Sequence, residues 1–248
     1  AGLLRPVYHG HEATRQLKEL VRGYETLSDD TQRMMVRIKA IYRAHGIRTP
    51  GSAVYQQKQR EQWLQLLTEP GTRQRLSWLY EELDHLRPLR KQAKMAMVAE
   101  GRKHRAFSLL RTIPQMGPVR CAMLVATVDT PYRFRTKRQL WAYSGLAIIT
   151  YMSSEYEIKA GRVVRNRKPV ATRGLNRNCN RRLKVLFTGA AAAGSRSEPY
   201  RSYVEGLQQK GIRAEMAGLT LARKIAAVAL RVWKKGETFD PKKLNSTT

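Results

Sequence analysis

The amino-acid sequence predicts a mainly α protein, in which a helical coiled-coil region precedes a helix-hairpin-helix-containing domain with one small β-hairpin. Three observations support this fold class. Leucines from residue 76 to residue 86 recur at intervals of 3, 4 and 3 residues, the spacing of a coiled-coil seam. Two apolar helical runs flank the short turn 113–117. Apolar residues on both sides of Ala160-Gly161 are typical of a β-hairpin.

The first part of the chain, residues 1–49, is predicted to contain a short strand and two helices. Residues 3–8 read as the strand, and because no partner strand is near in sequence, we expect the chain to be the downstream part of a longer protein. An amphipathic helix is expected over 11–27. Ser28 is the expected cap of a second helix, because two carboxylates follow it and carboxylates favour the positive end of a helix.

Residues 50–105 are predicted to form a helical coiled-coil arm. A breaker at 49–52 leads to a helix over 54–67, and one long helix could extend over 72–111 with a kink at Pro88. The seam of this helix consists of Leu76, Leu79, Leu83 and Leu86. An antiparallel arm of the same chain or a second subunit would bury it, and the sequence leaves both open. We expect self-association into a dimer or tetramer through these leucines, because an exposed seam would leave a large apolar patch in water.

The domain over 106–193 begins with a helix, the turn 113–117 and a second helix. Pro114 lacks a backbone donor and ends the first helix, and Gly117 is expected to take the positive φ of a short reversal. Pro118 suits the first turn of the next helix. Outward-facing amides at this helix start would suit a DNA phosphate. A purely structural αα-turn is the alternative.

The later part of the chain is expected to be helical apart from the hairpin. The expected elements are a short helix over 134–146, the hairpin over 155–165, a basic helix over 175–193, and, within the closing part 194–248, helices over 197–209 and 214–235 before a frayed tail.

The charge of the chain indicates a polyanionic partner. The sequence has 47 Lys and Arg against 19 Asp and Glu, a formal net charge of +28 and a pI near 10.8. Nucleic acid is therefore the expected partner. A membrane is not expected, because Arg223, Lys224 and Arg231 interrupt the most apolar run, which falls short of the ~18 apolar residues of a spanning helix. The residues expected to contact DNA are Gln115, Met116, Gly117, Val119, Arg120, Arg133, Arg135, Lys137, Arg138, Arg165, Arg167, Arg173, Arg177, Arg181 and Arg182.

No metal site is expected within this chain. Its two cysteines, Cys121 and Cys179, stand alone, and its five histidines lack the spacing of metal ligands. This cysteine usage indicates a reducing compartment. Ser153 and Ser154 lie at the mouth of the expected hairpin, beside the most basic part of the chain. A serine there could attack or hold a phosphodiester, although most loop serines only cap a helix or form local hydrogen bonds.

Four motifs occur in order along the chain. They are Leu110-Arg-Thr-Ile-Pro-Gln-Met-Gly-Pro-Val, Tyr132-Arg-Phe-Arg-Thr-Lys-Arg-Gln-Leu-Trp-Ala-Tyr-Ser-Gly-Leu, Ser153-Ser-Glu-Tyr, and Thr172-Arg-Gly-Leu-Asn-Arg-Asn followed by Arg181-Arg182-Leu183. In this order and spacing they resemble the C-terminal half of the insertion-sequence-110 (110/116/902) transposases, relatives of the Piv and MooV DNA invertases. The resemblance is strongest over 106–193.

The resemblance implies a divided active site. Members of this family have an N-terminal RuvC-like domain whose carboxylates hold magnesium, and residues 2–8 look like the segment just after the last of them. Residues 1–49 would then include the end of that domain, and Mg²⁺ is expected for the full-length enzyme only. In the family a serine of the C-terminal domain is the nucleophile and links transiently to DNA. Ser153 matches that position, with Ser154 as the fallback because the family's usual Ser-Gly is Ser-Ser here.

The resemblance also implies partners. In the family a structured non-coding bridge RNA pairs with donor and target DNA, and the RuvC-like domain of another subunit completes the active site. We therefore expect a DNA-binding and recombination module of a prokaryotic transposase, cytoplasmic and nucleoid-associated, that forms a homo-oligomer and is inactive by itself. The alternative is a non-catalytic helix-hairpin-helix nucleic-acid-binding protein or a decayed transposase remnant.

Overall fold

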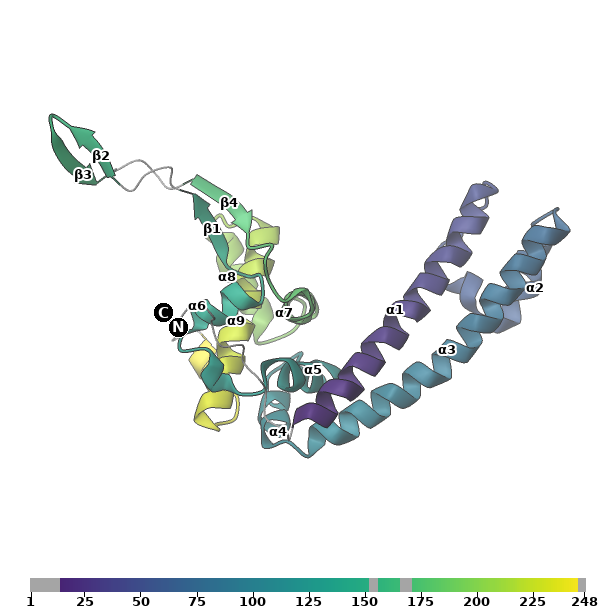
Figure 1. The fold of residues 1–248 in the computed structure, drawn as a ribbon, viewed down its shortest axis with the longest axis horizontal. Helices are drawn as coiled ribbons and strands as arrows, with labels where there is room; N and C mark the ends of the chain where they lie inside the picture. The colour runs from purple at the N-terminus through teal and green to yellow at the C-terminus, as the bar shows by residue number, and fades with distance from the viewer. Residues whose placement is uncertain (1–13, 152–155, 166–170, 245–248) are drawn as a thin grey trace, which may run out of the picture. The chain divides into compact units, whose positions relative to one another are not determined.

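The computed structural model describes residues 14–151, 156–165 and 171–244. The chain divides into two compact units, Ala1–Lys103 and His104–Thr248. Both consist mainly of helices, which confirms the predicted fold class, and the described strands belong to the second unit (Figure 1). Within the described ranges, no helix is both long and apolar enough to cross a membrane.

Two long antiparallel helices form the first unit. α1 (Arg15–Ala44) and α3 (Pro70–Arg102) lie side by side (Figure 1). The connection between them contains η2 (Ala53–Tyr55), η3 (Gln57–Gln59) and α2 (Arg60–Gln65). Pro70 opens α3, as a helix tolerates proline in its first turn, and the helix continues past Pro88. The long helix predicted over 72–111 therefore ends earlier, at residue 102.

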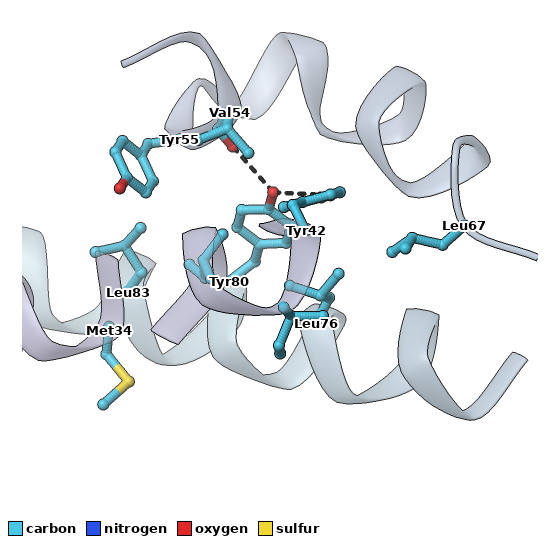
Figure 2. Packing of buried hydrophobic residues seen from close by; sticks show 10 residues of the cluster. Met34, Tyr42, Val54, Tyr55, Leu67, Leu76, Tyr80 and Leu83 are labelled. Carbon is cyan, nitrogen blue, oxygen red and sulfur yellow. Dashed lines mark hydrogen bonds between the residues drawn. The ribbon is translucent and has the colours of Figure 1, made fainter. Parts of the chain in front are cut away.

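The leucine seam of α3 packs inside the chain. Leu76 and Leu83 are fully buried, and Leu79 and Leu86 pack half-buried against the same core, which includes Met34 of α1 (Figure 2). Of the two ways to bury this seam, the structure shows the antiparallel arm of the same chain. Leu76 and Leu83 therefore offer no surface to a second chain, whereas Leu79 and Leu86 keep part of theirs, and contact between subunits through these two leucines is not tested. Self-association as such stays a prediction.

The helix start predicted at Ser28 is wrong, since α1 passes this position without a break. One of the carboxylates that suggested a cap, that of Asp30, pairs instead with Arg33 at 2.8 Å, one turn further on. The Thr31 hydroxyl donates to the carbonyl of Leu27 at 2.6 Å, inside the helix. Because short polar side chains can bond in this way within a helix, a Ser-Asp-Asp-Thr run does not by itself mark a helix start.

A buried polar cluster fixes the connection between the two long helices. The Tyr80 hydroxyl lies 3.2 Å from the Tyr42 hydroxyl and donates to the carbonyl of Val54 at 3.0 Å (Figure 2). Arg60 forms two hydrogen bonds with Asp84 and places its guanidinium 4.6 Å from the ring centroid of Tyr80. Burial raises the pKa of Tyr80, and the hydrogen bonds from Arg60 lower the pKa of Asp84. The tyrosine therefore stays a neutral donor and the carboxylate stays charged.

The second unit is built around α9 (Ala214–Lys235), which confirms the helix predicted over 214–235. Its buried side chains include Leu221 and Ile225. It contacts α4 (Arg105–Arg111), α6 (Lys137–Tyr143), α7 (Arg181–Gly194), α8 (Tyr200–Gln209) and the turn η4 (Pro131–Arg133). α5 (Pro118–Val128) packs against α4 and α7, and η5 (Pro241–Leu244) follows α9.

Two antiparallel strand pairs lie between α6 and α7 in the sequence. β2 (Tyr156–Lys159) and β3 (Arg162–Arg165) form the hairpin predicted over 155–165, which is confirmed. β1 (Ile148–Tyr151) pairs with β4 (Ala171–Leu175), a pairing that the sequence did not predict. β4 contains Gly174, and glycine is depleted in strands, so the segment lacks a strand signal. α7 starts at residue 181 rather than at the predicted residue 175, because residue 175 belongs to β4 and Asn180 caps the helix.

Candidate nucleic-acid interface

The turn between α4 and α5 follows local backbone rules. Gln115 takes the positive φ of this turn, 65°, whereas Gly117 has φ −65° and ψ 168°. The positive φ predicted at Gly117 is therefore wrong. Pro118 is the reason, because a residue that precedes proline is driven into the extended region. Gly117 thus precedes α5 in an extended conformation, and Pro118 occupies the first turn of the helix as predicted.

Two arginines bind carbonyl groups of this turn. Arg111 donates to the Met116 carbonyl at 3.0 Å, and Arg120 donates to the Gln115 carbonyl at 2.8 Å. The Gln115 amide donates in turn to the Ser197 hydroxyl at 3.1 Å, in the segment before α8. The guanidinium groups therefore use part of their donors to hold the shape of the turn.

Met116 and Cys121 belong to the interior of the turn. Met116 is 1% exposed, and its amide donates to the carbonyl of Ile113 at 3.1 Å. The buried Cys121 thiol donates to the Met116 carbonyl at 3.3 Å. This corrects the role expected for Met116, since its side chain, amide and carbonyl are all used inside the protein. Gly117 and Val119 stay half-buried at the start of α5.

Arg133, expected to contact DNA, is used in packing. Its guanidinium donates to the carbonyl of Thr127 at 3.1 Å and lies 5.1 Å from the ring centroid of Tyr143. The nearby Arg135 and Arg138 are exposed instead. Of these three arginines, only the last two have an exposed side chain, and their contact with DNA stays a prediction.

Basic side chains at the start of α7 are exposed. Asn180 caps this helix by accepting a hydrogen bond from the amide of Leu183 at 3.1 Å. Arg181 and Arg182 follow in the first turn, and Arg177 lies in the preceding loop. Cations in a first turn oppose the helix dipole, so helix stability does not account for their placement. Contact with phosphate would account for it.

The expected nucleophile lies outside the described residues. Ser153 and Ser154 fall between β1 and β2, and Arg167 falls between β3 and β4. Arg165 and Arg173 belong to β3 and β4 by their backbone, and their side chains also lie outside what the structure describes. The roles expected for these five residues therefore stay predictions.

Cations of α9 form a site that the sequence analysis did not single out. In the sequence, Arg223, Lys224 and Arg231 only interrupt an apolar run. In the structure they line a cavity of about 580 Å³ together with Lys137 of α6. Two helical turns separate residues 224 and 231, so the helix predicted from the sequence already places them on one face. The sequence does not show which residues of other segments pack beside that face.

The segment that matches a known family contains most of these features. Residues 107–205, from α4 to α8, match the family model described as "Transposase IS116/IS110/IS902 family". None of the curated proteins matches the chain. The matched span includes the α4–α5 turn, both strand pairs and the exposed arginines of α7. The resemblance found in the sequence is thereby confirmed, and residues 107–205 of this chain form a transposase domain of the IS116/IS110/IS902 family.

Proposed function

We propose that this chain is the DNA-binding and recombination module of an insertion-sequence transposase, acting at the nucleoid in the cytoplasm of a prokaryote. The observation that supports this most directly is the transposase domain over 107–205. A transposase binds DNA, and the formal net charge of +28 suits that polyanion.

We infer that DNA phosphates bind the exposed arginines of the second unit. These are Arg135, Arg138, Arg177, Arg181 and Arg182. Because contacts to phosphate fix position without reading bases, we expect weakly sequence-specific binding. Sequence choice would then belong to a structured bridge RNA that pairs with donor and target DNA.

For the chemical step we propose Ser153 as the nucleophile, with Ser154 as the alternative. The serine Oγ would bond to a DNA phosphorus while one bridging P–O bond breaks, and the serine proton would pass to the released DNA hydroxyl. The exchange replaces one phosphate ester with another. A DNA hydroxyl can therefore later reverse it and release the serine.

We propose that the ligands of magnesium lie outside the described residues. Among those residues, no three or more His, Cys, Asp or Glu side chains form a group that could hold a metal ion. No step is therefore assigned to a metal within this part of the chain. We propose that the RuvC-like domain of another subunit of a homo-oligomer holds Mg²⁺, and that the chain by itself binds DNA without cleaving it.

Salt dependence tests the DNA role. Fluorescence anisotropy of a labelled duplex, titrated with the full chain at several salt concentrations, gives the Kd at each. Binding releases counterions, so with about six or more phosphate contacts the affinity should fall about 10³-fold or more from 50 to 200 mM salt. A structured RNA should behave in the same way. An affinity that does not change with salt would refute the proposed DNA role.

The serine step is tested by adding a RuvC-like domain, Mg²⁺ and labelled DNA to the chain. A denaturing gel should show a protease-sensitive shifted band, the protein joined to DNA. Ser153→Ala should abolish this band and leave the DNA affinity nearly unchanged, because one neutral hydroxyl adds little to so basic a surface. Ser154→Ala is the matched control. Loss of the band in Ser154→Ala alone would move the role to Ser154, and a band that persists in both variants would refute the serine mechanism.

A further inference from the structure

A cavity of about 580 Å³ lies in the second unit between α6, α9 and the segment that follows α9. Lys137, Lys224 and Arg231 line it. Burial, and then the charges of Lys137 and Arg231, lower the pKa of Lys224 below its ordinary value. Arg223 also lines the cavity, and its Nη2 atom is buried without a hydrogen-bond partner among the described residues. A bound anion would offset the repulsion between the cations and could give this atom an acceptor.

Cations outnumber the acidic groups around the cavity. Seven Lys and Arg residues line it, against the two carboxylates of Glu237 and Asp240. Glu237 lies 3.9 Å from the ammonium of Lys235, and Asp240 accepts a hydrogen bond from the amide of Lys242 at 3.0 Å. The net charge of the cavity lining is therefore positive.

Flat aromatic rings lie beside these cations. The ammonium of Lys137 is 5.8 Å from the ring centroid of Trp141, and that of Lys224 is 5.9 Å from the ring centroid of Tyr203. Both rings line the cavity. A nucleotide needs this combination, because its base stacks on a ring while its phosphate binds a cation.

Hydrogen bonds between α9 and residues 134–146, the segment that contains α6, hold this wall in place. Trp141 donates through Nε1 to the carbonyl of Arg223 at 2.9 Å. Arg223 donates through Nε to the carbonyl of Leu146 at 2.7 Å, and Lys234 donates to the carbonyl of Phe134 at 2.5 Å. The cavity is therefore preorganised, which lowers the entropy lost when a ligand binds.

We propose that this cavity binds one unpaired nucleotide of a single-stranded nucleic acid, with its phosphate on Lys137, Lys224 and Arg231 and its base on Trp141 or Tyr203. The inference rests on the proposed nucleic-acid role of the chain and adds a site that adjoins the exposed arginines, since Arg135 also lines the cavity. A volume of about 580 Å³ falls within the range of small-ligand pockets, roughly 300–1,000 Å³. Within a duplex the base faces are stacked on one another, so the rings could not reach them.

Charge-removal variants of the full chain test the phosphate contact. A short labelled oligothymidylate and a duplex are titrated with Lys224→Gln and with the matched control Lys210→Gln, whose lysine is exposed at the end of α8 and does not line the cavity. Lys224→Gln should weaken oligothymidylate binding about tenfold, as expected for one charge-assisted hydrogen bond. It should weaken duplex binding no more than Lys210→Gln does. Arg231→Gln should repeat this pattern.

Tryptophan fluorescence tests the base contact. Oligothymidylate or oligouridylate should quench Trp141, and loss of the quenching in Trp141→Phe would assign the signal to this ring. The oligonucleotide that binds with the higher affinity identifies DNA or RNA as the source of the nucleotide. Polyglutamate, which carries charge without bases, should not quench.

Two results would overturn the inference. One is an equal loss of oligothymidylate affinity in Lys224→Gln and Lys210→Gln, and the other is quenching by polyglutamate as strong as that by the oligonucleotides. If either occurs while duplex binding keeps its salt dependence, the cavity has another role and the proposed function stands. If the chain binds no nucleic acid at all, both proposals fail together.

Discussion

Gly145 allows a quantitative test of the packing in the second unit. It follows α6 with a φ of 67°. Its amide bonds to the carbonyl of Ala142 at 3.3 Å, and the amide of Leu146 bonds to the carbonyl of Trp141 at 2.8 Å, which closes the helix end as a Schellman motif does. A Cβ added to Gly145 would lie 2.4 Å from the Sγ of Cys179. An alanine there meets both an unfavourable backbone region and an occupied space.

Gly145→Ala should therefore destabilise the second unit by about 2–5 kcal/mol. A left-handed backbone costs a residue with a side chain about 1–2 kcal/mol, and overpacking costs typically about 1–3 kcal/mol. Gly236→Ala is the matched control, because Gly236 has a φ of 66° and the nearest atom to an added Cβ is 3.6 Å away. This control should be destabilised only by the cost of the left-handed backbone, about 1–2 kcal/mol.

Urea unfolding measures these losses. Trp63→Phe and Trp78→Phe in the background leave only the tryptophans of the second unit to report by fluorescence. Cys179→Ala, combined with Gly145→Ala, removes the atom at 2.4 Å and should recover about 1–2 kcal/mol. The reasoning is refuted if Gly145→Ala costs no more than Gly236→Ala, or if Cys179→Ala recovers nothing.

Other parts of the structure give three simpler predictions. Leu83→Ala should destabilise the first unit by about 2–5 kcal/mol because this side chain is fully buried, whereas Leu89→Ala at an exposed position should change its stability by less than about 0.5 kcal/mol. Urea unfolding followed by circular dichroism compares the two, and equal losses would contradict the packing. Iodoacetamide should modify Cys179 and spare Cys121 from about pH 7 to about pH 9, because burial raises the pKa of Cys121 to about 12, and peptide mass spectrometry would reveal any equal labelling. Asn180→Ala should cost about 1 kcal/mol by removing the cap of α7, and Asn180→Asp, which can also cap, should cost less in the same unfolding assay.

Local signals in the sequence predicted most helices but not every boundary. Pro118 predicted the start of α5 and apolar periodicity predicted α9, because both signals are set by neighbouring residues. The cap predicted at Ser28 failed because α1 has buried side chains both before and after that position, and this packing overrides a local cap preference. The β1–β4 pair was missed because each strand depends on a partner elsewhere in the chain.

The sequence predicted the positive charge of the candidate site, but it did not predict which of its side chains are buried. Net charge and four motifs predicted the DNA role and the family domain. The sequence could not tell that Met116 shapes the turn or that Arg133 binds backbone carbonyls, since a donor serves either an internal carbonyl or an external phosphate depending on the fold. The cavity beside Lys224 was missed for the same reason, because its walls come from segments far apart in the sequence.

The central position of α9 also determines when the second unit can fold during synthesis. Because α9 follows every helix that it contacts, the core of the second unit cannot close until residue 235 has left the ribosome. α1 and α3 are complete at residue 102, so the first unit can close its core much earlier. Until α9 emerges, the apolar faces of α4, α6, α7 and α8 that it covers remain open on the growing chain. A nascent chain that stalls before residue 214 should therefore be a chaperone substrate, although its first unit has already folded.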